Sequence, residues 1–400
     1  MTDVQDEASS SPATDSDAVA DGDEKSHGIQ IFSAPSDAPR VRWRTDLISA
    51  GFSTALLLVL ILIAGNGSTL DTNTLTFIGT LPGWMLWLGQ VAYVVGVLYA
   101  FGLLVGVGFV ARKRVELLRD MVLAAALAVS GVLALTLLID ERWPEFAIFD
   151  LNQSRETFPA FFLTTSTAIQ AAASPHLTAP MRKIGWTFVL AAVGASVLGG
   201  VSTVSDTLGG LLVGLIAAAL IRYVFGTSAG LPSTGRIRSG LADLGVQVED
   251  LDYAAEQPEA SIVLKATSSD GDPLFVSGLG RDSWSSRRWT RWWKAAWYQD
   301  QGSQYGSDRR QQIEHEALTM LLADQGGAPV PPLVTIGMSG RDDALLVAGL
   351  LDHTLNDVSA DEVDDDVLDA MWSALDALHD ADISHGSLDS VHVWFDSTGA

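Results

Sequence analysis

Two short stretches of the chain contain residues whose types and spacing could support chemistry. Ser202 and Asp206 stand four positions apart at the start of a glycine-rich apolar run, and His385 and His392 enclose a polar loop that also holds Ser387. Phosphoryl transfer needs a nucleophile, a proton donor and cations around the phosphate oxygens. Ser202 has a carboxylate nearby but no histidine to act as its base, and Ser387 cannot accept a proton near neutral pH. The spacing therefore indicates two site-like positions without an activated nucleophile.

Composition separates a membrane-like middle from acidic ends. Of 400 residues 48% are hydrophobic and 18% charged, and the formal net charge is −24. An acidic balance argues against nucleic-acid binding, which needs a basic surface. The chain has no cysteine and its histidines lack the spacing of zinc ligands, so no metal site is expected. Residues 1–39, rich in Asp, Ser and Ala, are predicted to form a disordered acidic tail.

Residues 40–225 contain long runs without charged side chains. A bilayer needs about 20 mostly apolar residues per helix, and the runs provide six such segments. We therefore predict an α-helical polytopic membrane bundle with six spans. The predicted spans are residues 47–64, 85–110, 121–139, 157–181, 184–205 and 207–221.

The basic residues orient these spans, because Lys and Arg favour the cytoplasmic side. With six spans, the arginines before the first span, the basic 112–114 connection, Arg182 and Arg222 all fall on one side. Both chain ends are therefore predicted to be cytoplasmic, in a plasma membrane protein. Asp206 falls at the outer mouth of a span, where a carboxylate is costly and usually paired or functional.

The stretch from Ser202 to Gly214 resembles the third signature of the type-2 phosphatidic acid phosphatases. In that family a histidine, three residues and an aspartate precede a glycine-rich span. The resemblance implies that Ser202 stands at the position of the nucleophilic histidine and Asp206 at the position that orients it. Six spans with all signatures at the outer face are also similar to the family's topology.

The other signatures of that family fall on three further stretches. Pro159 and Phe162 lie where the second signature carries its general-acid histidine, which corresponds to Phe162. Arg142 lies where the first signature binds phosphate, and Ser196 stands at the position of a signature arginine. Because both histidines are replaced, the resemblance implies a membrane block that has lost phosphatase chemistry.

After the last span the pattern changes to that of a soluble α+β region. Residues 226–240, rich in Gly and Ser, are predicted to be a linker, and residues 241–400 a cytosolic domain. Helices are predicted at 311–323 and 361–380, the first with Ile313, Leu318, Leu321 and Leu322 on one side. Strands are predicted at 260–265, 273–278, 333–336, 344–347 and 391–395.

This order of elements, followed by the loop from His385 to His392, resembles a protein-kinase-like small lobe running into a large lobe. It is most similar to lipid- and aminoglycoside-kinase-like domains of actinobacterial membrane proteins. In those proteins a phosphatase-like block, a kinase-like domain and a flippase-like domain related to lysyl-phosphatidylglycerol synthase occur in series. The resemblance implies membrane lipids and a flippase-like domain of a longer chain as partners. Too few residues follow the predicted 361–380 helix to build a large lobe, so we expect an incomplete kinase-like domain.

The reactive positions of a kinase are substituted as well. A kinase uses a strand lysine and a helix glutamate to hold phosphates, an aspartate as base and an asparagine for magnesium. The resemblance places Ser277 at the lysine position and Glu316, or Glu314, at the glutamate position. It places Ser387 and His392 at the base and asparagine positions. No cofactor is therefore expected, while nucleotide binding without transfer stays open, with Lys265 as a replacement cation or merely a solvent-facing lysine.

A tryptophan- and arginine-rich segment lies at residues 281–298. Such a segment suits the headgroup region of an anionic membrane, and the alternative is an insert packed on the kinase-like domain. The candidate membrane-surface residues are Arg287, Arg288, Trp289, Arg291, Trp292 and Lys294.

Three functions follow from these observations. The favoured one is a non-catalytic membrane protein with a regulatory or scaffolding role in envelope lipid handling, because the catalytic positions of both parts are substituted. The second is an unconventional ATP-dependent phosphotransferase of the kinase-like fold. The third is a lipid-binding or transport module that uses an outer cavity near Asp206.

Overall fold

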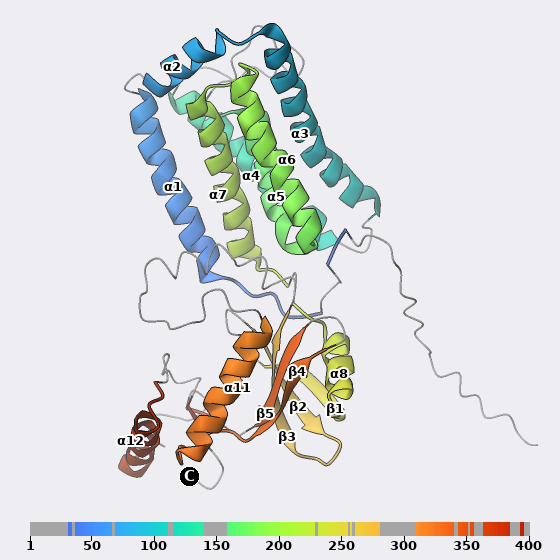
Figure 1. Cartoon of the computed structure of the whole chain (residues 1–400), viewed down its shortest axis with the longest axis vertical. Helices are drawn as coiled ribbons and strands as arrows, with labels where there is room; N and C mark the ends of the chain where they lie inside the picture. Colours follow the sequence, from blue (N-terminus) through green and yellow to red (C-terminus); the bar gives the residue numbers. More distant parts are fainter. Residues whose placement is uncertain are drawn as a thin grey trace, which may run out of the picture.

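The fold consists of a helical bundle joined to a smaller α+β lobe (Figure 1). The computed structural model describes residues 31–33, 37–65, 69–110, 115–139, 158–228, 231–254, 257, 261–280, 309–339, 343–350, 353–355, 363–384 and 393–395.

In the described part of the bundle, five helices are long and apolar enough to cross a bilayer. They are α1 (Arg44–Gly65), α3 (Gly83–Val110), α4 (Val115–Ile139), α6 (Ala179–Leu198) and α7 (Val204–Phe225). Each contains a charge-poor run recognised in the sequence, and each has 20 residues or more. Many of their large apolar side chains are exposed, as expected of surfaces that meet lipid.

The expected span 157–181 is not one continuous helix. Its described part forms α5 (Phe161–Ala173), a 3-10 turn, η1 (Ser174–His176), and the start of α6. Pro175 lies in the turn, and proline removes a backbone donor and breaks a helix. The expected span 184–205 is displaced as well, because α6 ends before Gly199 and α7 begins at Val204.

Helix α5 occupies the centre of the bundle. Eleven of its thirteen residues are buried, and it contacts α3, α4, α6 and α7. At one end Thr136 of α4 donates to the carbonyl of Phe158, and at the other Arg222 of α7 donates to the carbonyl of Ala171. Helix α5 thus runs between the two ends of its neighbours although it is much shorter than they are.

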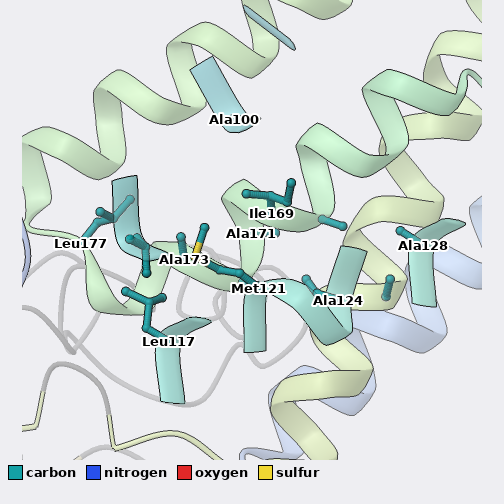
Figure 2. Close-up of a cluster of buried hydrophobic side chains, with 14 residues drawn as sticks. Ala100, Leu117, Met121, Ala124, Ala128, Ile169, Ala171, Ala173 and Leu177 are labelled. Atoms are coloured by element: carbon teal, nitrogen blue, oxygen red, sulfur yellow. The ribbon is translucent and has the colours of Figure 1, made fainter. Parts of the chain in front are cut away.

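The core of the bundle is built largely from small residues. One cluster at the end nearest the lobe contains Leu117, Met121, Ile169 and Leu177 packed among alanines of α3, α4, α5 and α7 (Figure 2). Between α3 and α6, a Cβ at Gly89 would lie 2.7 Å from the backbone nitrogen of Gly199. Small residues at such contacts let helix backbones approach closely, which is how helices associate in lipid.

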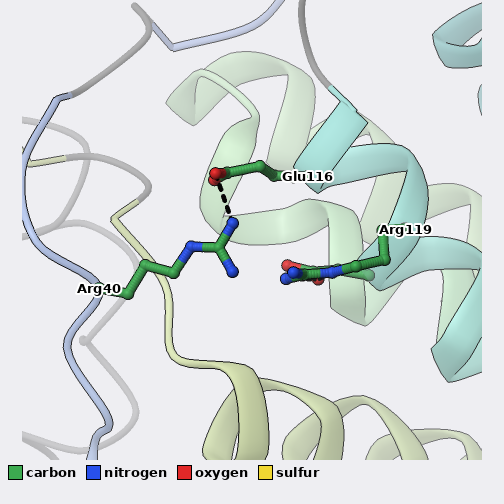
Figure 3. Close-up of polar contacts among 4 residues, drawn as sticks. Arg40, Glu116 and Arg119 are labelled. Carbon is green, nitrogen blue, oxygen red and sulfur yellow. Dashed lines mark hydrogen bonds and ion pairs between the residues drawn. The ribbon is translucent and has the colours of Figure 1, made fainter.

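The end of the bundle nearest the lobe carries several charged residues in ion pairs. Arg40 pairs with Glu116, and Arg119 pairs with Asp120 beside it (Figure 3). Arg222 pairs with Asp46 across α7 and α1, with Nε and Oδ1 2.9 Å apart. The basic residues in the described parts therefore gather at one end, as the positive-inside pattern requires.

A short helix, α2 (Thr69–Ile78), lies across the opposite end of the bundle (Figure 1). Its ten residues include four threonines, an asparagine and an aspartate. This polar composition contains no apolar run, so the sequence patterns used above did not indicate it.

Residues 31–33 and 37–43 form an N-terminal strap between the bundle and the lobe. Phe32 makes a β-bridge with Leu177 at the bundle, and Val41 makes one with Thr227 after α7. Ala38 is buried in the core of the lobe. Residues 31–33 and 37–39 of the expected disordered tail are therefore part of the folded structure, and residues 1–30 and 34–36 lie outside the described part of the chain.

The lobe is a five-stranded antiparallel sheet with strand order β1-β2-β3-β5-β4. Helix α8 (Thr234–Asp243) contributes to the core on one face and α11 (Arg309–Gln325) to the core on the other. The strands are β1 (Val248–Tyr253), β2 (Ile262–Ser268), β3 (Pro273–Leu279), β4 (Leu333–Met338) and β5 (Ala344–Gly349).

Several predictions for this region need correction. Helix α8 begins inside the expected linker 226–240, although Gly226 does end α7, with a φ of 67°. Strand β1 was not predicted, because its three acidic residues obscure the alternation of apolar and polar side chains that is typical of a strand. The buried side of α11 is formed by Ile313 and Ala317, whereas three of the four residues expected together on one side are exposed: Leu318, Leu321 and Leu322.

Three further elements follow the sheet. Strands β6 (His353–Thr354) and β7 (Trp394–Phe395) pair in a two-stranded ribbon. Helix α12 (Asp365–Asp380) begins four residues later than the predicted 361–380 helix, and Asp364 caps it by accepting from the N–H of Val367.

Candidate functional site

The described positions that the sequence analysis compared with phosphatase signatures lie at the end of the bundle away from the lobe (Figure 1), around the first turn of α7. The Thr203 hydroxyl accepts from the N–H of Asp206, and the Asp206 carboxylate accepts from the N–H of Thr203, both at 3.1 Å. This is a capping box, which satisfies backbone donors that the first helical turn cannot pair internally. The Asp206 carboxylate, whose burial at the end of a span would be unfavourable without a partner, thus caps the N-terminus of α7.

A second carboxylate reaches the same helix start from α2. Asp71 Oδ1 accepts from the N–H of Ser205 at 3.1 Å, and its Oδ2 accepts from the Ser205 hydroxyl at 2.6 Å. Two carboxylates therefore face the positive end of the α7 dipole, where negative charge is stabilising. The two residues are 134 positions apart in the chain, so their contact could not be inferred from the sequence.

Ser202 lies in a buried cluster of three hydroxyls. Its Oγ is 2.8 Å from Oγ1 of Thr207, which in turn is 3.1 Å from Oγ of Ser196. All three side chains are buried. The structure therefore brings together two predicted positions, Ser196 and Ser202, but joins them through Thr207, which the sequence analysis did not single out.

Pro159 packs against the glycine-rich face of α7. A Cβ at Gly209 would lie 2.6 Å from the Phe158 ring and 3.3 Å from Cβ of Pro159. The N–H of Ala160 donates to the carbonyl of Asp206, which fixes the start of α5 beside the start of α7. Phe162 has an edge-to-face contact with Phe161. Arg142 lies outside the described residues.

These contacts stabilise the first turn of α7 and do not form a catalytic arrangement. The hydroxyl of Ser202 interacts with Thr207, and hydroxyls at these positions cannot act as a general base near neutral pH. The T-x-x-D pattern at Thr203–Asp206 is itself a helix N-terminus signal in the sequence. It would have predicted the capping role of Asp206 without any structure.

In the lobe, the kinase-like positions lie on the face of the sheet covered by α11. Ser277 is buried on β3, opposite Val263 of β2 and Leu346 of β5. Phe275, two residues earlier, shares this face because side chains alternate along a strand. The predicted lysine position is therefore inside the lobe, occupied by a neutral hydroxyl.

A small cavity opens between this face, α11 and the ribbon strand β7. It has a volume of about 80 Å³, far below the roughly 300–1,000 Å³ of ordinary ligand pockets. Trp394 meets Phe275 edge-to-face, with ring centroids 6.3 Å apart. The lining residues are Phe275, Glu316, Met320, Pro331, Leu346, Ala348, Gly349, Leu350 and Trp394.

Glu316 is the charged member of that described lining. Glu316 as a whole residue is exposed. Its carboxyl nevertheless lies against the apolar side chains of the cavity, and the resulting desolvation raises the pKa of the carboxyl. An anion with no lysine or arginine in the same lining would repel phosphate groups. The described cavity therefore does not fit a nucleotide, in volume or in charge.

Lys265 lies on the same face of the sheet as Phe275, which lines this cavity. It pairs with Phe275 across β2 and β3, and directly opposed residues project from the same face of a sheet. Lys265 is exposed and is not part of the cavity lining.

The remaining predicted residues cannot be placed. Ser387, His392 and all six membrane-surface candidates between Arg287 and Lys294 lie outside the described residues. Within the described parts, no three His, Asp or Glu side chains converge to hold a metal ion.

Comparisons with known proteins give little further information. No protein-family profile matches the chain, and no curated protein matches it. Among solved structures it is similar to vaccinia related kinase 3, with 15% identity over 38% of this chain and 44% of that one, and a TM-score of 0.25. The chain spans less than half the length of that kinase, and a TM-score this low does not establish a shared fold.

Proposed function

We propose that this chain is a non-catalytic integral membrane protein that holds a kinase-like small lobe against the cytosolic end of a phosphatase-like bundle. Its role would be regulatory or scaffolding, in the handling of envelope lipids in the plasma membrane. Membrane lipids are the partners that this proposal requires.

One observation carries the proposal. The residues at the phosphatase-like positions are engaged in structural contacts: Asp206 caps α7, and Ser202 and Ser196 share Thr207. Residues committed to a helix cap and a buried hydroxyl cluster are not available to bind and cleave a phosphate ester. The need for a stable bundle explains why these residue types are present, and a catalytic role is not required to explain them.

The proposal includes six crossings of the membrane, with α5 as the short fourth one. The carbonyl of Phe158, just before α5, lies beside Thr136, and the carbonyl of Ala171, near the end of α5, lies beside Arg222. Thr136 and Arg222 are at opposite ends of the long helices. A helix of 13 residues is about 20 Å long, too short for a bilayer by itself, but its burial inside the bundle keeps its ends from contact with lipid. Six crossings leave the strap and the lobe on the same, arginine-rich side.

The kinase-like part of the proposal depends on the order of elements in the lobe. Three antiparallel strands, a helix and two further strands precede a ribbon and a long helix. The helix packs on the face that carries Ser277 and Phe275. The strap supports a scaffolding role because its contacts with both parts limit how far the lobe can move from the bundle.

A phosphatase assay on the full chain tests the proposal. The protein is reconstituted in vesicles containing phosphatidic acid, and release of inorganic phosphate is followed beside protein-free vesicles. We expect background release from both the native chain and Ser202→Ala. Release above background that Ser202→Ala abolishes would show that the site is catalytic and would overturn the proposal.

The second candidate is a nucleotide-dependent activity of the lobe, and one observation favours it. Lys265 projects from the same sheet face as Phe275, one strand away from Ser277, so it offers a cation near a position where a kinase needs one. Thermal unfolding of the full chain with ATP, with and without magnesium, separates the candidates. A stabilisation by ATP that Lys265→Gln removes would favour the second candidate, and an unchanged melting temperature excludes it.

A further inference from the structure

Helix α5 carries a row of polar side chains through the middle of the bundle. Thr164, Thr167 and Gln170 follow each other at intervals of three, so they lie along one side of the helix. All three have no exposed surface. Polar groups inside a membrane bundle are costly and usually mark a functional path or a bound molecule.

Glycines of the neighbouring helices face this row. A Cβ at Gly210 would lie 3.0 Å from Oγ1 of Thr164, and a Cβ at Gly214 would lie 2.7 Å from Cβ of Thr167. A Cβ at Gly185 of α6 would overlap the amide of Gln170. The polar row therefore lies in a seam where α6 and α7 present backbone instead of side chains.

Two members of the row have no hydrogen-bond partner in the described structure. Thr164 donates to the carbonyl of Ala160 at 2.7 Å. The hydroxyl of Thr167 and both polar atoms of the Gln170 amide are buried and unpaired. Buried amides and hydroxyls are almost always paired with protein or with ordered water, so these three atoms indicate a missing partner.

The row continues towards both ends of the bundle. On the outer side, Thr207 lies on the same face of α7 as Gly210 and Gly214, at intervals of three and four, and joins the Ser196 and Ser202 hydroxyls. On the inner side, Arg222 donates to the carbonyl of Ala171, next to Gln170. Polar groups thus follow α5 from one end to the other.

We propose that this seam binds internal water, held chiefly by Thr167 and Gln170. The unpaired set contains an NH₂ donor, a carbonyl acceptor and a hydroxyl, and water both donates and accepts. A cation would coordinate the two oxygens but leave the amide NH₂ unpaired. Buried polar groups that lack protein partners are the usual sites of conserved internal water.

The test uses the full chain in detergent micelles with glutamine side-chain amides labelled by ¹⁵N. Gln170→Met identifies the Gln170 signal by its loss. We expect a cross-peak between that amide and immobilised water in the native chain, and at least a twofold weaker one in Thr167→Val. Thr165→Val is the matched control, because Thr165 is paired with the carbonyl of Phe161, and it should leave the cross-peak unchanged.

Two outcomes overturn the proposal. The first is a Gln170 amide without a water cross-peak, which would mean that the seam is dry. The second is a Gln170 signal that shifts when potassium replaces a large organic cation in the buffer, which would indicate a cation site. Thermal unfolding gives an independent check: Gln170→Met should lower the melting temperature if it deprives bound water of its partners, whereas a rise would show that the amide was simply unpaired.

Discussion

At the scale of single residues, Asp206 and Ser202 show how partners decide what a side chain does. A carboxylate four residues from a hydroxyl at the mouth of a membrane helix resembles part of a phosphoryl-transfer site. Here the carboxylate accepts from the N–H of Thr203, and the hydroxyl interacts with Thr207. The same residue types that could do chemistry beside a histidine instead stabilise the start of α7.

The capping box gives a prediction for Thr203. Thr203→Ala removes the acceptor for the N–H of Asp206 and should lower the free energy of unfolding by about 1 kcal/mol, within the range of about 0.5–2 measured for such caps. Reversible unfolding in mixed micelles measures the change. Thr203→Ser keeps a hydroxyl at the same place and should lose much less. An equal loss in both variants would mean that the hydroxyl is not what stabilises the helix.

At the scale of elements, the sequence predicted what depends on long apolar runs and missed what depends on contacts. The runs identified the five long helices, and the alternation at residues 273–278 identified β3. Helix α2 and strand β1 were missed because polar and acidic residues hide their patterns. The length of α5 could not be predicted either, because its short apolar core is stabilised by four neighbouring helices rather than by lipid.

The candidate sites divide in the same way. The positions Ser196, Ser202 and Asp206 lie near one another at one end of the bundle, as expected of residues that are close in sequence. Thr207 and Asp71, which determine what these residues do, come from packing and from another helix. The sheet face toward which Ser277 projects could be assigned only once the register between β3 and β5 was known.

The contact between α5 and α7 gives the prediction at this scale. A Cβ at Gly214 would lie 2.6 Å from the carbonyl oxygen of Thr164 and 3.0 Å from the backbone nitrogen of Ala168, which are both backbone atoms that cannot rotate away. Gly214→Ala should therefore destabilise the bundle by about 1–3 kcal/mol, as overpacking does.

Gly194→Ala is the matched control for that change. Gly194 is also inside a helix, but a Cβ there meets no atom within 4 Å. Alanine has the higher helix propensity by about 1 kcal/mol, so this variant should be neutral or more stable in the same unfolding measurement. Equal effects of the two substitutions would contradict the close approach of α5 and α7.

At the scale of the whole molecule, the strap is what makes two parts one structure. Asp37 accepts from the N–H of Thr234 at 3.0 Å and from the Tyr253 hydroxyl at 2.8 Å, so one carboxylate joins the strap to α8 and to β1. Partial burial by itself raises the pKa of Asp37, but the hydrogen bonds from the Thr234 hydroxyl, the Tyr253 hydroxyl and the Thr234 N–H together outweigh it and hold the pKa below its usual 3.8.

The lowered pKa predicts acid sensitivity of the strap. Because the charged form is favoured in the folded state, the contribution of Asp37 is complete above pH 3.8 and is lost as the pH falls through the lower folded-state pKa. Amide exchange at residues 37–43, corrected for the intrinsic rate at each pH, should rise over that window. Asp37→Asn should weaken the strap already at neutral pH and remove the pH dependence, whereas Asp270→Asn, in the exposed turn after β2, should change neither. A native pH dependence that survives in Asp37→Asn would assign the effect to another group.

The arrangement of the whole chain across the membrane is testable because the chain contains no cysteine, so a single introduced thiol reports one position. Asn73 of α2 and Ser269 of the β2–β3 turn are exposed, and α2 and the sheet of the lobe lie at opposite ends of the molecule (Figure 1). With the arginine-rich end facing the cytoplasm, a membrane-impermeant maleimide should label Asn73→Cys in intact cells and Ser269→Cys only after the membrane is opened. Labelling of both from the same side would mean that the long helices do not separate these ends across the bilayer, and exchanged accessibility would invert the orientation derived from the arginines. The expected pattern requires an even number of crossings between the strap and the lobe, as in the proposed arrangement with α5 as a sixth crossing.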